Sequence, residues 1–289
     1  MGKRDVMKEI LPKGRGVWVP IDHGVTDFPC EGLEDIETTI KSLIAGNVNV
    51  IVAHKGVIDK FSHLCQGTKT SMIAHLSAST RHGGKNNNNK VLVGDVDEAI
   101  MRGAVGVSCQ VNIGCKKESA MLERMGHITT KAYLSDVPVL GMVYVRGENV
   151  NLMKNDSTNG YAHAARIAFE LGCDAVKTVW TGDKDSFSKI CRSAPVPLLV
   201  AGGPSTDDSK EILTMVKASI EAGGAGVCMG RQIFAHQDAT AISMAIGMIV
   251  HNNASVEEAL EKYGSEGSGK NLPFSSLSED LKKKEEEKE

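Results

Sequence analysis

The sequence has no long hydrophobic run. No stretch of its 289 residues approaches the roughly 18 consecutive apolar residues that a membrane-spanning helix requires. The start, MGKRDVMKEILPKG, is too polar for a secretory signal, and Val6 stands where N-myristoylation of Gly2 would need serine or threonine. We therefore expect a cytoplasmic protein that has no membrane partner.

Cysteine pairing motifs and a strong net charge are missing as well. The seven cysteines are odd in number, include no CxxC pair and lie mostly in apolar surroundings, so we expect reduced core residues. Lysine and arginine number 33 against 36 aspartates and glutamates, for a net charge of −3. This balance gives no general attraction to nucleic acid or anionic lipid, but it leaves room for small phosphorylated ligands bound locally.

What the chain does contain is an alternation of short apolar, β-branched runs with longer amphipathic segments. The strand candidates are residues 16–22, 48–53, 71–76, 104–111, 137–144, 173–179, 196–202 and 224–230. Helices are predicted between them, for example over 33–46, 96–103, 159–172 and 210–223, each ending in the glycine that commonly follows a helix. The pattern is that of eight repeated strand–helix units.

Eight such units in a chain of this length predict an α/β fold, a single-domain (β/α)8 or TIM barrel, over residues 1–263. A doubly wound sheet is the alternative, although no GxGxxG follows the first strand. Two segments fall outside the pattern. RHGGKNNNNK (81–90) is predicted to be a flexible loop, and residues 264–289, which end in KKKEEEKE, are predicted to be a disordered or loosely attached tail.

One charged residue, Lys177, stands inside the apolar run DAVKT. Side chains alternate along a strand, so if Ala175 and Lys177 point into the barrel, Val176 and Thr178 face the helices. At the mouth of the barrel we expect desolvation to lower the pKa of Lys177, which would favour attack on a ketone to form a Schiff base. The alternative is a lysine that extends toward solvent and pairs with a carboxylate.

Polar side chains also follow other strands. PIDHG places Asp22 and His23 at the end of the first strand, and VYVRG places Tyr144 and Arg146 at the end of the fifth. A carboxylate and a phenol that converge on a lysine supply a general acid and base for carbinolamine dehydration and carbon–carbon cleavage. Taken singly, each is weak evidence, because an aspartate before glycine is often a turn residue and a strand tyrosine often serves packing.

The last two strands end in glycine-rich sequence. AGGPST carries Gly202 and Gly203, and MGRQ carries Gly230 and Arg231, each near the predicted start of a helix. Free backbone N–H groups and the helix dipole favour an anion there, so these four residues are predicted to bind phosphate. The alternative is that the glycines simply end their strands.

Taken together, the motifs resemble one enzyme family. PIDHGV, HKG (54–56), VYVRG, DAVKTVWTGD, VAGGP and MGRQIF, in this order, are similar to those of the archaeal-type class I aldolase family, from about residue 10 to residue 263. That family includes fructose-bisphosphate aldolases and 2-amino-3,7-dideoxy-D-threo-hept-6-ulosonate synthases. The resemblance implies Lys177 as Schiff-base lysine, Asp22 and Tyr144 in acid–base roles, and phosphate contacts from the two glycine loops. It also implies a homo-oligomer, since members of the family form large assemblies that include decamers, and we expect no cofactor.

Within the family, PIDHGV, GLEDIETTI and HKG are more similar to the heptulosonate synthases, because the fructose-bisphosphate aldolases tend to read YDHG and to carry arginine at the position of Lys55. The resemblance implies that a phosphorylated keto-sugar is cleaved and a ketone fragment is passed to L-aspartate semialdehyde, on a route to aromatic amino acids. Two residues depart from the pattern: Val145 replaces proline, and Gln110 stands where synthases tend to carry histidine. A fructose-1,6-bisphosphate aldolase, or an aldolase joining dihydroxyacetone phosphate to aspartate semialdehyde, stays open.

The ends of the first three strands allow further interpretations. His23, His54, Lys55 and Arg146 are expected to contact substrate, with Lys55 as a second cation that assists the Schiff-base lysine. His23, His54 and His75 could instead hold zinc, but no HxH or HExxH spacing is present and we expect no metal. A non-catalytic barrel that binds a small molecule is the remaining alternative, against which the retained amine, carboxylate and phenol argue.

Overall fold

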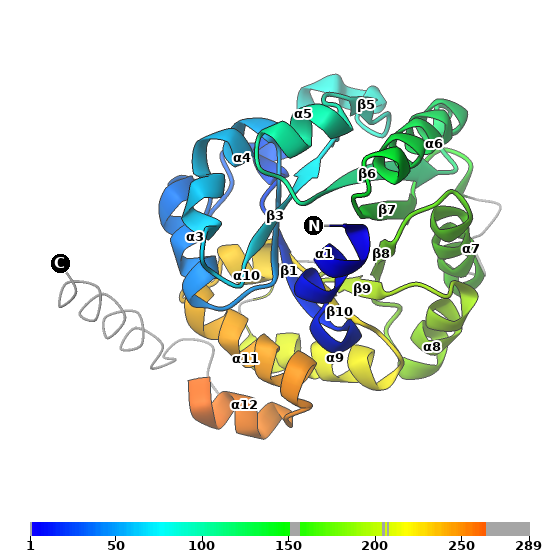
Figure 1. Cartoon of the computed structure of the whole chain (residues 1–289). Coiled ribbons are helices and arrows are strands. Elements are labelled where there is room, and N and C mark those ends of the chain that lie inside the picture. The colour runs from blue at the N-terminus through cyan, green and yellow to red at the C-terminus, as the bar shows by residue number, and fades with distance from the viewer. Residues whose placement is uncertain (1, 151–156, 204–205, 207, 264–289) are drawn as a thin grey trace.

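Eight parallel strands close into a barrel in this protein, for which a computed structural model describes residues 2–150, 157–203, 206 and 208–263 (Figure 1). The strands follow one another around the barrel as β1 (Gly16–Pro20), β2 (Val50–Ala53), β3 (Ser71–His75), β6 (Gly106–Ile113), β7 (Val139–Val145), β8 (Ala175–Val179), β9 (Leu198–Ala201) and β10 (Gly226–Cys228). β10 pairs back to β1 and closes the ring. Each strand candidate overlaps one of these strands, so the predicted TIM barrel is confirmed.

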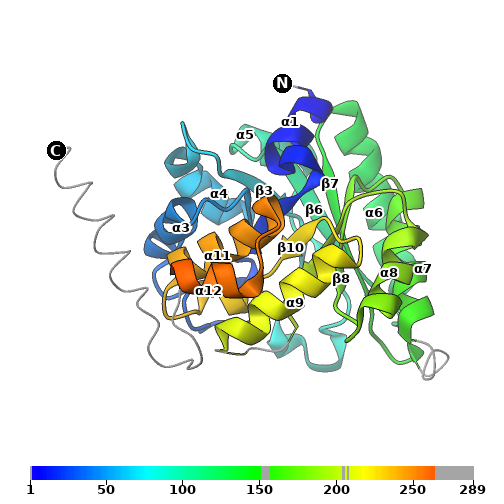
Figure 2. The same cartoon turned by 90° about the horizontal axis from the view of Figure 1, so that it is seen from below.

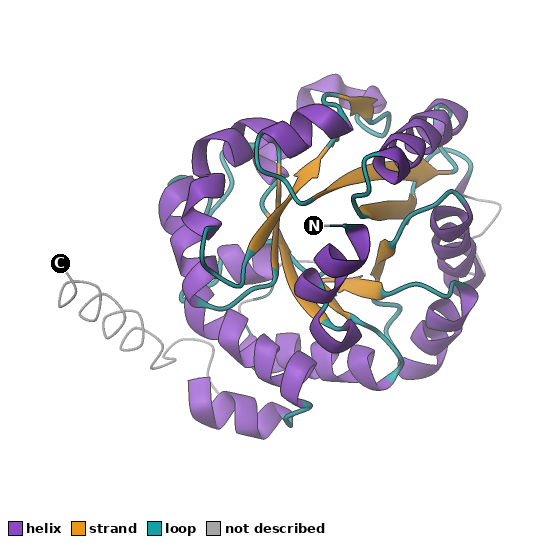
Figure 3. Ribbon diagram, viewed as in Figure 1, coloured by secondary structure: helices purple, strands orange, loops and turns teal. Residues whose placement is uncertain are grey.

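Helices surround the barrel (Figure 3). They are α2 (His23–Asp27), α3 (Ile36–Ala45), α4 (Lys55–Phe61), α5 (Val96–Met101), α6 (Glu118–Leu134), α7 (Ser157–Glu170), α8 (Lys184–Ser193), α9 (Ser209–Glu221), α10 (Arg231–Phe234), α11 (Ala239–Asn252) and α12 (Val256–Tyr263). Aspartate side chains cap the N-termini of several helices, such as Asp183 on α8 and Asp238 on α11. Each accepts a hydrogen bond from a backbone N–H group of the first turn that has no partner within the helix. Gly172 and Gly223 adopt φ of 93° and 104° just beyond α7 and α9, a conformation that glycine adopts without strain.

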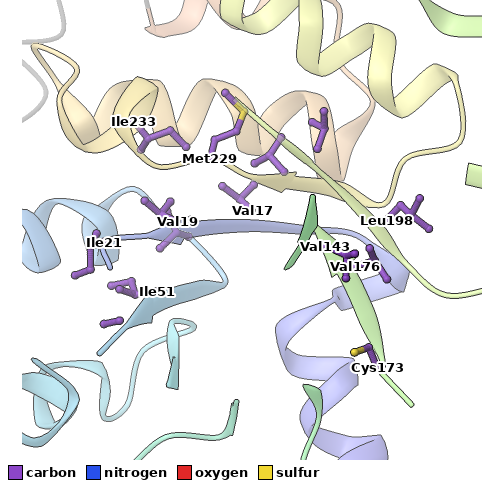
Figure 4. Packing of buried hydrophobic residues seen from close by; sticks show 14 of the residues in the cluster. Val17, Val19, Ile21, Ile51, Val143, Cys173, Val176, Leu198, Met229 and Ile233 are labelled. Carbon is purple, nitrogen blue, oxygen red and sulfur yellow. The ribbon is translucent and has the colours of Figure 1, made fainter. Parts of the chain in front are cut away.

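The alternation of side chains along the strands divides the core into two clusters. Val17, Val19 and Val176 point outward and pack beneath the helices (Figure 4), and Trp18 and Ala175 belong to the cluster inside the barrel. Full burial of such a valine stabilises the fold by about 1.5 to 3 kcal/mol. The predicted orientation of DAVKT is therefore confirmed, with Ala175 inside and Val176 outside.

One end of the barrel is closed by the N-terminal helix α1 (Lys3–Ile10), which lies across it (Figures 1 and 2). Val6 and Ile10 are buried in the inner cluster, and the Trp18 indole donates a hydrogen bond of 2.8 Å to the carbonyl of Ile10. Because α1 covers the ends at which the strands begin, the interior is accessible from the opposite end, where the strands finish.

The segment after β3 is more ordered than predicted. β4 (Ser77–Ala78) pairs antiparallel with β5 (Val91–Leu92), and a 3-10 helix, Arg81–Asn86, lies between them. The sequence did not predict β5, because this short strand follows the asparagine-rich run and its partner β4 lies on the other side of that run. The predicted tail, 264–289, lies outside the described residues.

Two composition-based expectations can also be compared with the structure. All seven cysteines are unpaired thiols, four of them buried. Within the described ranges, no helix is both long and apolar enough to cross a membrane.

Candidate active site

A cavity of about 500 Å³ opens at the carboxyl ends of the barrel strands. Its lining includes nine of the residues singled out from the sequence: Asp22, His23, Tyr144, Arg146, Lys177, Gly202, Gly203, Gly230 and Arg231. They come from five strand ends that are far apart in the sequence and that barrel closure brings together. Active sites of TIM-barrel enzymes lie at this end of the fold.

Lys177 lies in the wall of the cavity with 9% of its surface exposed. In the strand register it stands beside Met142 of β7 and Leu199 of β9, both of which belong to the inner apolar cluster. Its stem is therefore packed among apolar groups while its amine faces the cavity. This setting is that of a buried lysine and not of one extended into solvent.

The pKa of Lys177 differs from the expectation, because it is raised and not lowered. Burial alone would lower it, but interactions with Tyr144, Cys228 and Asp22 raise it by more. The Asp22 carboxylate is ionised at neutral pH, and an anion beside an ammonium favours the charged form. Lys177 therefore rests as an ammonium in the ligand-free protein, and it must lose a proton before it can act as a nucleophile.

Asp22 is surrounded by cationic or potentially cationic side chains. His75 Nε2 lies 3.7 Å and His23 Nδ1 lies 3.6 Å from its carboxylate oxygens. Burial raises its pKa, but His75, His23, Lys177 and His54 together lower it to about 2. Asp22 is consequently a carboxylate throughout the physiological range and is able to accept a proton.

Tyr144 has the opposite character. Burial raises the pKa of its hydroxyl, so the phenol is protonated at neutral pH and is able to donate. The Arg146 guanidinium lies over its ring, 5.0 Å from the centroid, which fixes both side chains on the same wall of the cavity. The cavity thus combines an ionised carboxylate, a protonated phenol and an amine.

Of the histidines predicted at the first three strand ends, His75 is buried, and His23 and His54 are half-buried near Asp22. His54 Nδ1 donates to the backbone carbonyl of His75 over 3.0 Å, and His75 Nδ1 shares a hydrogen bond of 2.8 Å with the Ser108 hydroxyl. Burial lowers the pKa of His23 and His54, and it lowers that of His75 to about 3. Among the described residues, no group of three or more histidine, cysteine, aspartate or glutamate side chains is arranged to hold a metal ion.

The neutral His75 predicts a loss of stability in acid. In the unfolded chain the imidazole titrates at 6.5, and in the folded protein at about 3, so between these values the unfolded state binds more protons. Stability is then fully present above pH 6.5 and falls by up to about 1.4 kcal/mol per pH unit as the pH drops toward 3. Urea unfolding at a series of pH values and one protein concentration measures this slope, and His75→Gln should flatten it.

The exposed His127 on α6 offers the control, because its side chain is 76% exposed. His127→Gln should leave the pH slope of the wild type unchanged. An unchanged slope in His75→Gln would contradict the assignment of the acid sensitivity to His75.

The two glycine loops of the cavity follow β9 and β10. Gly230 could not be replaced easily, because a Cβ atom there would lie 2.6 Å from His23 Cε1 and 2.7 Å from the carbonyl oxygen of Pro20. Gly203 adopts φ of 75°, which favours glycine. Arg231 begins α10 and is exposed at the cavity rim. The loops therefore bring backbone groups and one guanidinium to the same edge of the cavity.

Two predicted contact residues lie outside the cavity lining. His54 lies behind Asp22, as described above. The Lys55 amine points to α5, where it pairs with Glu98 at 3.1 Å, and its side chain is 43% exposed. Lys55 is also not among the groups that affect the pKa of Lys177 most strongly. Its ion pair is thus of the surface type, and this placement does not fit the assisting role expected for it.

A different second lysine, Lys90, lines the cavity and was not singled out from the sequence. It follows the asparagine run, is 9% exposed, and donates a hydrogen bond of 2.7 Å to the Ser79 hydroxyl. Burial lowers its pKa, opposed by attraction to Asp22. No carboxylate of the described residues lies within ion-pair distance of it. The only sequence signal was the apolar VLV that follows Lys90, which marks the edge of a hairpin.

Comparison with known proteins agrees with this geometry. The profile of the DeoC/LacD family aldolases matches residues 17–236. The chain is 34% identical over 263 residues to the 2-amino-3,7-dideoxy-D-threo-hept-6-ulosonate synthase of Halobacterium salinarum, covering 91% of this chain and 97% of that protein. It is 35% identical over 237 residues to the 2-amino-4,5-dihydroxy-6-oxo-7-(phosphonooxy)heptanoate synthase of Streptomyces griseus, covering 81% and 84% of the two chains.

A solved structure is similar over most of its length. It is an archaeal fructose-1,6-bisphosphate aldolase with its catalytic lysine covalently bound to the carbinolamine intermediate of the substrate. The identity is 28% and the TM-score 0.76, with 85% of this chain and 98% of that chain covered. The family match spans well over half of the present chain, which therefore belongs to the DeoC/LacD aldolase family and is a class I aldolase family enzyme.

Proposed function

We propose that this enzyme is a Schiff-base-forming transaldolase that cleaves a phosphorylated keto-sugar and transfers its ketone fragment to L-aspartate semialdehyde. The observation that carries the proposal is the single cavity in which the buried Lys177 faces an ionised Asp22 and a protonated Tyr144. The similarity to a 2-amino-3,7-dideoxy-D-threo-hept-6-ulosonate synthase supports the choice of reaction. We place the reaction early in aromatic amino acid biosynthesis, in the cytoplasm.

The chemistry starts at the amine of Lys177. Once deprotonated, Nζ attacks the carbonyl carbon of the ketone, and the carbinolamine that forms loses water to give an iminium. The iminium withdraws electrons from the adjacent carbon–carbon bond. That bond breaks when the neighbouring hydroxyl loses its proton, which leaves an enamine on Lys177 and releases an aldehyde. The enamine then attacks the acceptor aldehyde, and water hydrolyses the product from the enzyme.

Asp22 and Tyr144 divide the proton transfers according to their charge states. Asp22, with its pKa lowered to about 2, is the base that accepts the proton from the Lys177 ammonium or from a substrate hydroxyl. Tyr144, whose pKa is raised, is the acid that donates to the departing carbinolamine hydroxyl. Asp22 returns its proton to the alkoxide that carbon–carbon bond formation creates, and Tyr144 regains its proton from the water that adds to the product iminium.

The phosphate of the donor sugar is assigned to the glycine loops. Gly202, Gly203 and Gly230 line the cavity without a Cβ atom over their backbone, and Arg231 adds the positive charge at the rim. Backbone amides and a guanidinium are the usual partners of a phosphate. His23 packs edge-on against Phe234, with ring centroids 5.2 Å apart, and contacts the substrate between this end and Lys177.

The opposite side of the cavity is assigned to the acceptor. Lys90 and Arg146 both line it, and the buried Lys90 lacks a carboxylate partner among the described residues. A buried cation without a counter-ion is costly, so a substrate anion at this position stabilises the complex. L-aspartate semialdehyde carries an α-carboxylate, which Lys90 and Arg146 would neutralise while its aldehyde faces the enamine.

Gln110 favours a second candidate reaction, because it lines the cavity at a position where the heptulosonate synthases tend to carry histidine. Its Nε2 donates a hydrogen bond of 2.9 Å to Asn112 Oδ1. The products named for the Streptomyces griseus and Halobacterium salinarum enzymes share a seven-carbon skeleton and differ at carbon 7, which carries a phosphonooxy group in the first and no oxygen in the second. The ketone fragment is dihydroxyacetone phosphate in the first case and hydroxyacetone in the second. An enzyme that joins dihydroxyacetone phosphate to aspartate semialdehyde would therefore use the same cavity.

Borohydride trapping tests the proposed function. The enzyme is incubated with fructose 1,6-bisphosphate, dihydroxyacetone phosphate or a 6-deoxy-keto-sugar phosphate, reduced, and analysed by intact mass and peptide mapping, with and without chelator. We expect one reduced adduct, on Lys177, that is insensitive to the chelator. An adduct on another lysine, or none with any donor, would refute the Schiff-base mechanism for this chain.

Product analysis then separates the reactions. Each donor is supplied with and without L-aspartate semialdehyde, and the seven-carbon product is identified by mass. A product without phosphate from the 6-deoxy donor supports the transaldolase, whereas a phosphorylated product from dihydroxyacetone phosphate supports the second candidate. Turnover of fructose 1,6-bisphosphate that needs no aspartate semialdehyde would identify a simple aldolase.

Lys90→Met should weaken acceptor binding specifically. Loss of one charge-assisted hydrogen bond, worth about 1.5 to 3 kcal/mol, should raise KM for L-aspartate semialdehyde by roughly 10- to 100-fold. The trapped adduct with donor alone should keep its yield. KM is measured in parallel with propionaldehyde, an acceptor that has no carboxylate. An equal rise in KM for both aldehydes would contradict the assignment of Lys90 to the carboxylate.

We also propose a homo-oligomer, on the strength of the resemblance between the motifs and the archaeal-type aldolases. Light scattering coupled to gel filtration measures the molar mass directly. A mass equal to one chain of 30.9 kDa would refute this assignment.

A further inference from the structure

A second cavity, of about 750 Å³, lies at the end of the barrel where the strands begin. We refer to it as the N-terminal cavity. It is lined by Lys8, Glu9, Pro12, Lys13, Arg15, Asn47, Asn49, Thr68, Lys69, Ser71, His251 and Asn252. These residues precede or begin β1, β2 and β3, or belong to α1 and the end of α11. The strands separate this cavity from the catalytic one by roughly 15 Å, at about 3.3 Å for each strand residue.

The floor of the N-terminal cavity is the side chain of Asn49, which is only 7% exposed. Its Oδ1 accepts a hydrogen bond of 2.8 Å from the backbone N–H of Val17 and lies 3.0 Å from His251 Nε2. Because a backbone N–H can only donate, the oxygen of the amide must face Val17. The Nδ2 amino group therefore faces the other way, toward the cavity.

The donors of this amino group have no protein acceptor among the described residues. A nearly buried amide that leaves both of its N–H donors to the cavity is uncommon, because buried polar groups are normally paired. The same geometry makes His251 Nε2 a donor, since the acceptor is Oδ1 of Asn49. Burial lowers the pKa of His251, with the charge of Arg15 adding to the effect, so this ring is neutral.

The walls and rim of the N-terminal cavity are mainly cationic. Arg15 is half-buried, and its Nη1 donates a hydrogen bond of 3.2 Å to the backbone carbonyl of Val250. Lys13 and Lys69 are exposed at the rim, and neither forms an ion pair with a described carboxylate. Lys8 pairs with Asp5 at 3.0 Å, and Glu9 is the single acidic residue of the lining. The lining thus places positive charge around a floor of amide donors.

One rim residue is also held in an unusual conformation. Lys13 adopts φ of 55°, in the left-handed region, where a residue with a Cβ atom is strained by about 1 to 2 kcal/mol. The strain is independent of the amide geometry of Asn49, and both features belong to the same cavity.

We propose that the N-terminal cavity binds a small organic anion, through its phosphate or carboxylate group, as a site separate from the catalytic cavity. The anion accepts hydrogen bonds from Asn49 Nδ2 at the floor and is neutralised by Arg15, Lys13 and Lys69. The volume accommodates a ligand of the size of a sugar phosphate or a tricarboxylate. Bound there, the anion touches the beginnings of β1 and β2, whose other ends carry Asp22 and His54.

Isothermal titration calorimetry of the full chain at low ionic strength tests this site, with inorganic phosphate in one arm and citrate in the other. Asn49→Asp is the critical variant, because the aspartate keeps an acceptor for Val17 and replaces only the amino group by an oxygen. Arg231→Gln is made in parallel to weaken binding in the catalytic cavity. We expect one binding component that Asn49→Asp weakens by at least tenfold and that Arg231→Gln leaves intact. The arm in which this component is stronger identifies the preferred anionic group.

Lys69→Gln keeps the inference testable if Asn49→Asp fails to fold, since its side chain lies at the rim. Lys69→Gln should weaken the same component severalfold, and the exposed Lys60→Gln on α4 should not. Binding that is lost in Arg231→Gln but unaffected by the changes at Asn49 and Lys69 would overturn the N-terminal site. A component that depends on Arg231 reports only on the catalytic cavity, so the two assignments succeed or fail separately.

Discussion

Replacing Lys177 with methionine should lower turnover by about ten-thousand-fold or more, because the only nucleophile of the proposed mechanism is removed. Methionine has a similar length and suits the apolar contacts of the lysine stem with Met142 and Leu199. The barrel should therefore fold, and circular dichroism and oligomer mass should match the wild type. The measurement is the rate of seven-carbon product formation, together with the borohydride adduct, which should be absent.

Lys55→Met is the matched control for this experiment. Lys55 also follows a barrel strand, but its amine pairs with Glu98 outside the cavity. Exposed ion pairs contribute about 0 to 1 kcal/mol, so stability and adduct yield should change little. If Lys55→Met abolished the adduct and Lys177→Met retained it, the nucleophile would be Lys55 at the start of α4. The assignment of Lys177 as the Schiff-base lysine would then be wrong.

Asp22→Asn should reduce turnover by roughly 100- to 10,000-fold, the range typical of a lost general base. The change also removes the negative charge of Asp22, which contributes to raising the pKa of Lys177. The pKa of Lys177 should fall, because an ammonium without its counter-ion is less stable in a buried site. The rate of adduct formation, measured across pH with donor alone, should then reach its plateau at lower pH than in the wild type.

Asp59→Asn provides the control, since Asp59 belongs to α4, is absent from the cavity lining and pairs with Arg102 at 2.9 Å on the surface. It should leave both turnover and the pH profile unchanged. A shift of the plateau is a readout that a purely structural loss would not produce. If Asp22→Asn lowered the rate without moving the plateau, Asp22 would not be the anion that sets the pKa of Lys177.

Much of the architecture was accessible from local sequence pattern. Barrel strands are short and buried on both faces, so runs such as VNVIVA and VPLLVAG stand out from the amphipathic segments between them. The carboxyl ends of parallel strands meet at one end of a barrel, so residues that follow them in sequence are brought together whatever their separation. For that reason Asp22, Tyr144 and Lys177 could be grouped before the structure was known.

The orientation of side chains beyond the strand ends was not accessible in the same way. Lys55 and Lys90 both follow polar sequence near a strand, yet the amine of Lys55 turns to Glu98 on α5 whereas that of Lys90 turns into the cavity. The direction of Lys90 depends on the pairing of β4 with β5, and that pairing joins residues on either side of the asparagine run. Local composition carries no information about such a contact.

The charge state of Lys177 likewise depends partly on local sequence and partly on tertiary contacts. The sequence alone determined that Lys177 points into the barrel and is desolvated, because the alternation of a strand and the apolar neighbours are local properties. Only the tertiary structure decided that its pKa is raised, since Tyr144 and Cys228 lie on β7 and β10 and Asp22 follows β1. Desolvation depends on how many apolar atoms surround a group, whereas electrostatic attraction depends on which charges the closed barrel places beside it.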